Sequence, residues 1–241
     1  MTSKPWVAGP KELLQHAEEH LQLATPFDCR IAMISIDNAV ELSIRTYLGL
    51  PARIRQGKGP SRRQLELAMG FPELLDLIEE FGNDRLSGIE LGDIEWYHRL
   101  RNTLYHDGNG VTVDPDKVDA YFQIAKLLFS NLFPNSAESA PDLPASTLLG
   151  EFILKWASLE SQVKALAAKH VPRHARGFRN TLSLYDGLIA KGVIDPTMRA
   201  RLEEVTRARN SIVHSPAATE PGKLKQYLVT VDELLDTLPR E

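Results

Sequence analysis

Residues 101–106 read Arg-Asn-Thr-Leu-Tyr-His, and residues 209–214 read Arg-Asn-Ser-Ile-Val-His. The two stretches share the pattern R-N-x-x-x-H at an offset of 108 residues, 209 minus 101. On a helix the Asn and the His lie four residues apart and share a face, and the Arg is long enough to reach the same point. A helix-stopping sequence follows each stretch, Asp-Gly-Asn-Gly at 107–110 and Ser-Pro at 215–216. We therefore expect each His at the C-terminal end of a helix.

The likeness between the two motif regions continues on both sides of the motif. The matched positions are Pro115, Lys117, Val118 and Tyr121 with Pro221, Lys223, Leu224 and Tyr227 at an offset of 106, Leu74, Asp76 and Ile78 with Leu184, Asp186 and Leu188 at 110, and Glu41 with Glu160 at 119. Each motif is thus followed by a loop, a proline and an amphipathic helix, and proline is favoured at the first position of a helix. The pattern predicts two halves with the same helix order, related by internal duplication.

The spacing of apolar residues indicates the fold class. Apolar residues recur at helical spacing along nearly the whole chain, for example over 118–129. Alternating strand patterns hardly appear, and Val-Thr-Val at 111–113 is the only short β-branched run. We therefore expect an all-α protein.

A change of composition separates the two halves. Residues 134–146 (PNSAESAPDLPAS) contain three prolines and three serines, which is typical of a linker. The sequence predicts two tandem helical-bundle domains at 1–134 and 146–241, with a linker at 135–145.

The overall composition excludes several classes of protein. The chain has 241 residues, of which 43% are hydrophobic and 25% charged, as in ordinary globular proteins. A single cysteine, Cys29, excludes an intramolecular disulfide and a cysteine zinc site. The N-terminal residues contain no signal-peptide core, and no run of 18 apolar residues occurs. We expect a cytoplasmic protein that does not insert into a membrane.

Charge is distributed unevenly, although the net charge is only −4. Residues 51–64 contain five basic residues and no acid, and residues 169–179 contain four basic residues, two histidines and no acid. The basic residues are Arg53, Arg55, Lys58, Arg62 and Arg63 in the first segment, and Lys169, Arg173, Arg176 and Arg179 in the second. Two such loops at corresponding places favour contact with phosphates. The alternative is that these side chains only solubilise exposed loops.

The residue types of the motif suit phosphodiester chemistry. Arginine neutralises charge on a phosphoryl group, histidine transfers a proton, and asparagine orients either. This set needs no metal or cofactor. The structural alternative is that Asn and His cap the helix while Arg pairs with a carboxylate. His98, one turn before Arg101, either lines the same site or lies on the surface.

With these motifs, each half of the chain resembles the HEPN superfamily. HEPN domains are small α-helical bundles whose nuclease members carry R-x4-6-H, often with Asn after the Arg. The resemblance implies metal-independent RNA cleavage, commonly in toxin–antitoxin or antiviral defence systems, by two motifs that face each other in a dimer. Some HEPN toxins have a modified tyrosine two residues after the His. This chain departs from that pattern with Gly108 and Pro216.

The leading hypothesis is an endoribonuclease with one composite centre. Its catalytic residues are Arg101, Asn102, His106, Arg209, Asn210 and His214, and the basic segments bind RNA. One histidine deprotonates the ribose 2′-OH and the other protonates the leaving 5′-oxygen, which gives a 2′,3′-cyclic phosphate. The chain is then a pseudo-dimer, with an antitoxin or defence-complex protein as a partner and further homodimerisation left open.

Two other hypotheses remain open at this point. The first is a non-catalytic HEPN module that binds RNA, a nucleotide or a partner protein. The second is a purely structural helical adaptor. Catalysis requires the two motifs to meet across one cleft, whereas an adaptor does not.

Overall fold

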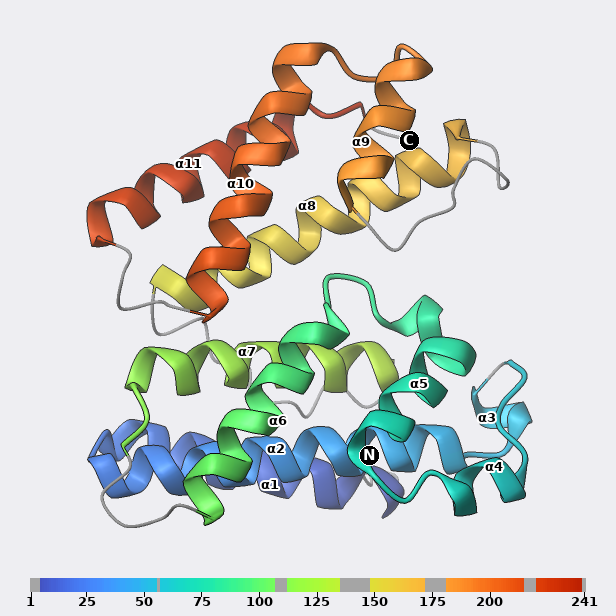
Figure 1. The fold of residues 1–241 in the computed structure, drawn as a ribbon, viewed down its shortest axis with the longest axis vertical. Helices are drawn as coiled ribbons and strands as arrows, with labels where there is room; N and C mark the ends of the chain where they lie inside the picture. The colour runs from blue at the N-terminus through green and yellow to red at the C-terminus, as the bar shows by residue number, and fades with distance from the viewer. Residues whose placement is uncertain are drawn as a thin grey trace. The chain divides into compact units, whose positions relative to one another are not determined.

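The computed structural model describes residues 5–55, 57–106, 112–134, 148–171, 181–214 and 220–239. Within these ranges every regular element is a helix and no strand occurs, which confirms the all-α prediction for the described residues (Figure 1). The chain divides into two compact units, Met1–Pro144 and Ala145–Glu241. The predicted linker at 135–145 lies outside the described residues.

The first unit is built around one long helix. Its elements are α1 (Pro5–Leu23), α2 (Pro26–Gly49), α3 (Ala52–Arg55), α4 (Arg62–Leu67), α5 (Phe71–Gly82), a 3-10 turn (Asn83–Arg85), α6 (Leu91–His106) and α7 (Pro115–Leu132). Helix α2 packs against α1, α5, α6 and α7. Figure 1 shows α1, α2 and α7 running side by side, with α6 crossing them. The motif helix α6 therefore lies directly against the central helix.

Local signals account for the start and the buried face of α2. The Thr25 hydroxyl accepts a hydrogen bond from the backbone N–H of Asp28 and so caps the helix. Ile36, Val40 and Ile44, which recur every four residues, are at most 1% exposed. The central helix thus presents one continuous apolar face to its neighbours.

The second unit has fewer helices. They are α8 (Leu148–His170), α9 (Thr181–Ala190), α10 (Pro196–His214) and α11 (Pro221–Thr237). Helix α8 packs against α9 and α11, and α10 packs against the same two helices. Phe152, Trp156, Leu159 and Val163 line the buried face of α8.

The helices next to the motifs begin and end where the sequence indicates. Helix α6 ends at His106 and α10 ends at His214, so the predicted C-terminal position of each histidine is confirmed. The following helices, α7 and α11, carry Pro115 and Pro221 in their first turns. No helix in the described part of the chain is long and apolar enough to cross a membrane.

Candidate functional site

The guanidinium of Arg101 is held on three sides in the first unit. Its Nη1 donates to Asn102 Oδ1 (2.9 Å), and its Nη2 donates to Asn38 Oδ1 on α2 (2.8 Å). Its Nε lies 3.3 Å from Asp37 Oδ2, as an ion pair rather than an aligned hydrogen bond. The side chain is 20% exposed. Arg101 therefore reaches the surface in an orientation that α2 determines.

Asp37 is the centre of this cluster, and its side chain is completely buried. The Tyr121 hydroxyl on α7 donates to Asp37 Oδ1 (2.9 Å), and His98 Nδ1 lies 2.9 Å from Oδ2. Burial, and then the neighbouring Asp37 carboxylate, raises the pKa of Tyr121 well above its usual range, so the hydroxyl keeps the proton that it donates. A buried carboxylate requires such partners, and Asp37 has them from two other helices.

His98 belongs to this cluster rather than to the open surface. It lies on α6, three residues before Arg101, and its side chain is 16% exposed. Its ring stacks on Phe71, the first residue of α5, with centroids 3.9 Å apart and planes 10° apart. The sequence left the place of His98 open, and the structure puts it between α5 and α2.

Sequence reasoning missed Asp37, Asn38 and Tyr121. A signal for the first two exists, since Asp37 and Asn38 interrupt the apolar run Ile36 to Val40 in a helix centre. Polar residues at such a position are buried only with partners. The identity of those partners depends on tertiary packing, because Tyr121 is 84 residues away in sequence.

In the second unit the motif has the same Arg–Asn contact in different surroundings. Arg209 Nη1 donates to Asn210 Oδ1 (3.4 Å), and Arg209 is only 3% exposed. Three residues before Arg209, where α6 has His98, helix α10 has Thr206. The Thr206 hydroxyl donates to the Leu202 carbonyl (2.7 Å) and contacts the Tyr185 hydroxyl (2.9 Å).

The long helix of the second unit also carries a buried acid. Glu160 on α8 is 1% exposed, and its Oε1 lies 3.1 Å from Nζ of Lys164 on the same helix. Within the described residues, neither carboxylate oxygen has a hydrogen bond. The sequence comparison matched Glu160 with Glu41, but Glu41 is a third exposed and pairs with Arg45. By burial, the residue of α2 that resembles Glu160 is Asp37.

The side chains of His106 and His214 are outside the described residues, as are Gly108 and Pro216. For these two histidines the structure describes only the backbone, which lies at the last residue of α6 and of α10. In the described part of the chain, no group of three His, Cys, Asp or Glu side chains could hold a metal ion.

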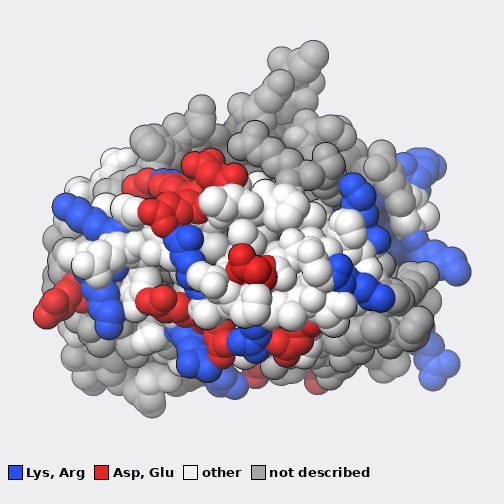
Figure 2. Space-filling view, turned by 90° about the horizontal axis from the view of Figure 1, so that it is seen from above, with Lys and Arg blue, Asp and Glu red and all other residues white. Residues whose placement is uncertain are grey.

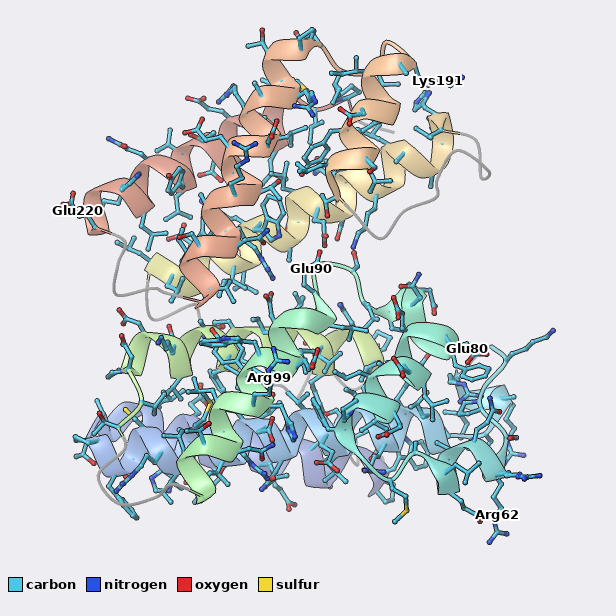
Figure 3. The ribbon with its side chains drawn as sticks, in the orientation of Figure 1. Arg62, Glu80, Glu90, Arg99, Lys191 and Glu220 are labelled. Atoms are coloured by element: carbon cyan, nitrogen blue, oxygen red, sulfur yellow. The ribbon has the colours of Figure 1, made fainter. Side chains whose placement is uncertain are left out.

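The predicted RNA-binding residues divide into three groups. Arg53, Lys58, Arg62, Arg63 and Lys169 are exposed, and Arg173, Arg176 and Arg179 lie outside the described residues. Arg62 projects from α4 into solvent and pairs with Glu66 (2.8 Å) (Figure 3). Figure 2 shows acidic and basic side chains interspersed over the face in view.

Arg55 forms the third group, because its side chain is buried, unlike those of the exposed basic residues. Arg55 is 6% exposed, and its Nη1 donates to the Leu48 carbonyl in the last turn of α2 (2.8 Å). The guanidinium lies against Gly59, where an added Cβ would come within 1.5 Å of Nη2. Arg55 therefore stabilises the end of α2.

One hollow of about 230 Å³ lies between α5 and α6, away from the motif residues. Its lining includes Asp76, Glu79 and Glu95, whose negative charge disfavours a phosphate ligand.

No family model matches the chain, and neither a curated protein nor a solved structure matches it. The site is therefore interpreted from its own residues.

Proposed function

We propose that the chain is a metal-independent endoribonuclease of the HEPN type. The observation that carries the proposal is the repeated geometry of the two motifs. In both, an Arg donates to the adjacent Asn on the last turns of a helix that ends at the motif His. The negative end of a helix dipole favours the protonated form of a histidine placed there. Such a histidine is suited to donate a proton near neutral pH.

In the proposed reaction, the ribose 2′-oxygen attacks phosphorus and the bond from phosphorus to the 5′-oxygen breaks. One of His106 and His214 accepts the 2′-OH proton, and the other donates a proton to the leaving 5′-oxygen. Arg101 and Arg209 hold the charge that develops on the phosphoryl oxygens. The products are a 2′,3′-cyclic phosphate and a 5′-hydroxyl.

The proposal includes an internal duplication that supplies both motifs from one chain. Its support is the common order of packing: α2 with α5 and α7 in the first unit, and α8 with α9 and α11 in the second. The motif helix packs against the last helix in both units. RNA, held by the exposed Arg53, Lys58, Arg63 and Lys169, is the proposed ligand. A role in cytoplasmic defence, with an antitoxin or other partner protein, rests on the HEPN resemblance.

A second candidate is a non-catalytic HEPN module, and one observation favours it. Arg209 is 3% exposed, whereas an arginine that clamps a phosphate must reach solvent. Arg101 also pairs with a carboxylate, as the structural interpretation of the motif expects. In that case the motifs stabilise the two helices, and the basic loops alone bind RNA.

The experiment that separates the two candidates is cleavage of a labelled RNA in excess EDTA. The nuclease proposal predicts cleavage at an undiminished rate, with a 2′,3′-cyclic phosphate on the upstream product. The matched control is the same oligonucleotide with a single 2′-deoxy nucleotide at the cleaved position, which should resist. RNA binding without any cleavage would instead establish the non-catalytic module.

A further inference from the structure

We propose that Asp37 and His98 are positioning residues that orient Arg101 toward the phosphate. The inference rests on the proposed nuclease function and adds two residues to its site. Neither residue belongs to the R-N-x-x-x-H motif, and Asp37 comes from a different helix. Both act through Arg101 rather than on the substrate.

Asp37 helps to set the direction of the Arg101 guanidinium. An arginine side chain on a surface loses rotamer freedom when it is fixed in one conformation, and this loss opposes binding unless it has already occurred. Asp37 pairs with Nε, at the inner edge of the guanidinium, while Nη1 and Nη2 contact Asn102 and Asn38. Part of this entropy is lost on folding rather than on substrate binding, so Arg101 is preorganised.

His98 helps to hold the carboxylate of Asp37. Tyr121 donates to Oδ1, and Arg101 faces Oδ2. His98 Nδ1 lies 2.9 Å from Oδ2 and 3.2 Å from Oδ1. The stack on Phe71 fixes the plane of the His98 ring and so the direction of Nδ1. Without a donor at Nδ1, the Tyr121 hydroxyl still holds Oδ1, but the carboxylate can turn about its Cβ–Cγ bond and carry Oδ2 away from Arg101.

The second unit is built differently. Thr206 stands three residues before Arg209, and its hydroxyl contacts Tyr185 and the Leu202 carbonyl. Glu160 is paired with Lys164 of its own helix. Among the described residues, Thr206 therefore takes the place of the imidazole in the second unit, and the two motifs have different surroundings.

The test uses two substitutions that differ in where they place a donor. The amide nitrogen of Asn lies near the position of Nδ1 in His, and that of Gln lies near Nε2. His98→Asn should therefore keep kcat within about threefold of wild type. His98→Gln should lower kcat by about 10²-fold with little change in KM, because the guanidinium is misplaced in the transition state.

A second readout does not require activity. The Arg101 Nε–Hε signal in a proton–nitrogen NMR spectrum is assigned by its loss in Arg101→Lys. It should persist in His98→Asn, and it should broaden or exchange away in His98→Gln and in Asp37→Asn. Thermal unfolding of each variant reports whether the fold is retained.

The outcomes separate the inference from the proposed function. If His98→Gln is active and His98→Asn is not, Nε2 is the atom in use and the positioning role is wrong. If both variants cleave like wild type, or both lose activity equally, the inference is also wrong. If neither wild type nor Arg101→Ala cleaves RNA, the proposed function fails, and the NMR signal alone decides the inference. An unchanged signal in His98→Gln and Asp37→Asn overturns it.

Discussion

The two motif helices share a six-residue pattern but embed their arginines differently. Arg101 is partly exposed and meets Asp37 and Asn38 of a neighbouring helix, whereas Arg209 is 3% exposed. Both donate to the adjacent Asn. The motif thus sets the Arg–Asn contact in both units, and in the first unit the long helix α2 sets where the arginine points.

The buried acids of the two long helices differ in a related way. Asp37 is bound by residues of α6 and α7, so it ties three helices together. Glu160 pairs with Lys164, four residues along its own helix. An interaction within one helix adds little to tertiary stability, whereas one that joins several helices is lost only when they separate.

The largest expected effect follows from this difference in the buried acids. Asp37→Ala should lower the free energy of unfolding of the first unit by about 3–5 kcal/mol, because Arg101 loses its buried counter-charge and His98 and Tyr121 lose a hydrogen-bond partner. Glu160→Gln should change the free energy of unfolding of the second unit by less than about 1 kcal/mol, because Gln keeps the volume of Glu160 and removes a fully buried charge whose partner Lys164 is 41% exposed and lies on the same helix. Urea unfolding followed by circular dichroism measures both changes. Equal losses of unfolding free energy in Asp37→Ala and Glu160→Gln would contradict the proposed difference between the two buried acids.

The next prediction concerns the two arginines in catalysis. Arg101→Ala and Arg209→Ala should each reduce single-turnover RNA cleavage by about 10²–10³-fold, as expected for loss of a donor to a developing negative charge. Arg101→Lys and Arg209→Lys should rescue poorly, because Lys lacks the planar fork. If Arg209→Ala cleaves RNA like wild type while Arg101→Ala does not, Arg209 is a structural residue, and the two motifs differ in function as well as in surroundings.

A smaller effect is expected from removing one tyrosine hydroxyl in each unit. Tyr121→Phe removes a hydrogen bond to a buried carboxylate and should cost about 1.5–3 kcal/mol. Tyr185→Phe removes a contact with the neutral Thr206 hydroxyl and should cost about 0.5–1.5 kcal/mol. The same urea experiment gives both values. A larger loss for Tyr185→Phe would mean that Asp37 is not the anchor of the first unit.

The smallest effect is a pH dependence confined to the first unit. Hydrogen bonds from Thr25 and then His20 hold the pKa of Asp28 below its ordinary 3.8. Asp28 therefore stabilises the folded state above pH 3.8, and this contribution is lost as the pH falls through the lowered folded value. Asp28→Asn should be less stable than wild type at pH 6, and the difference in unfolding free energy between the two proteins should narrow below pH 3.8. A difference that stays constant with pH would show that ionisation of Asp28 is irrelevant.

Local sequence signals predicted the parts of the fold that depend on neighbouring residues. The prolines at 115 and 221 lie in the first turns of α7 and α11, where backbone chemistry alone favours them. Apolar periodicity likewise gave the all-α class. These features need no knowledge of distant contacts.

The parts that sequence reasoning missed depend on side chains that meet after folding. Asp37 is 61 residues before His98, and nothing local indicates that they pair. Arg55 counted as part of a basic loop, yet the space left by Gly59 lets it turn back onto α2. A count of charges gives the composition of a loop but not the direction of each side chain.

The most direct test of the central claim is single-turnover RNA cleavage in EDTA by wild type, His106→Ala, His214→Ala and the double variant. If the two histidines share the acid and base roles, each single change should remove about 10²–10⁴-fold of the rate, and the double variant should lose little more. If both single variants cleave like wild type, or if cleavage by wild type stops in EDTA, the two motifs do not form a metal-independent nuclease centre.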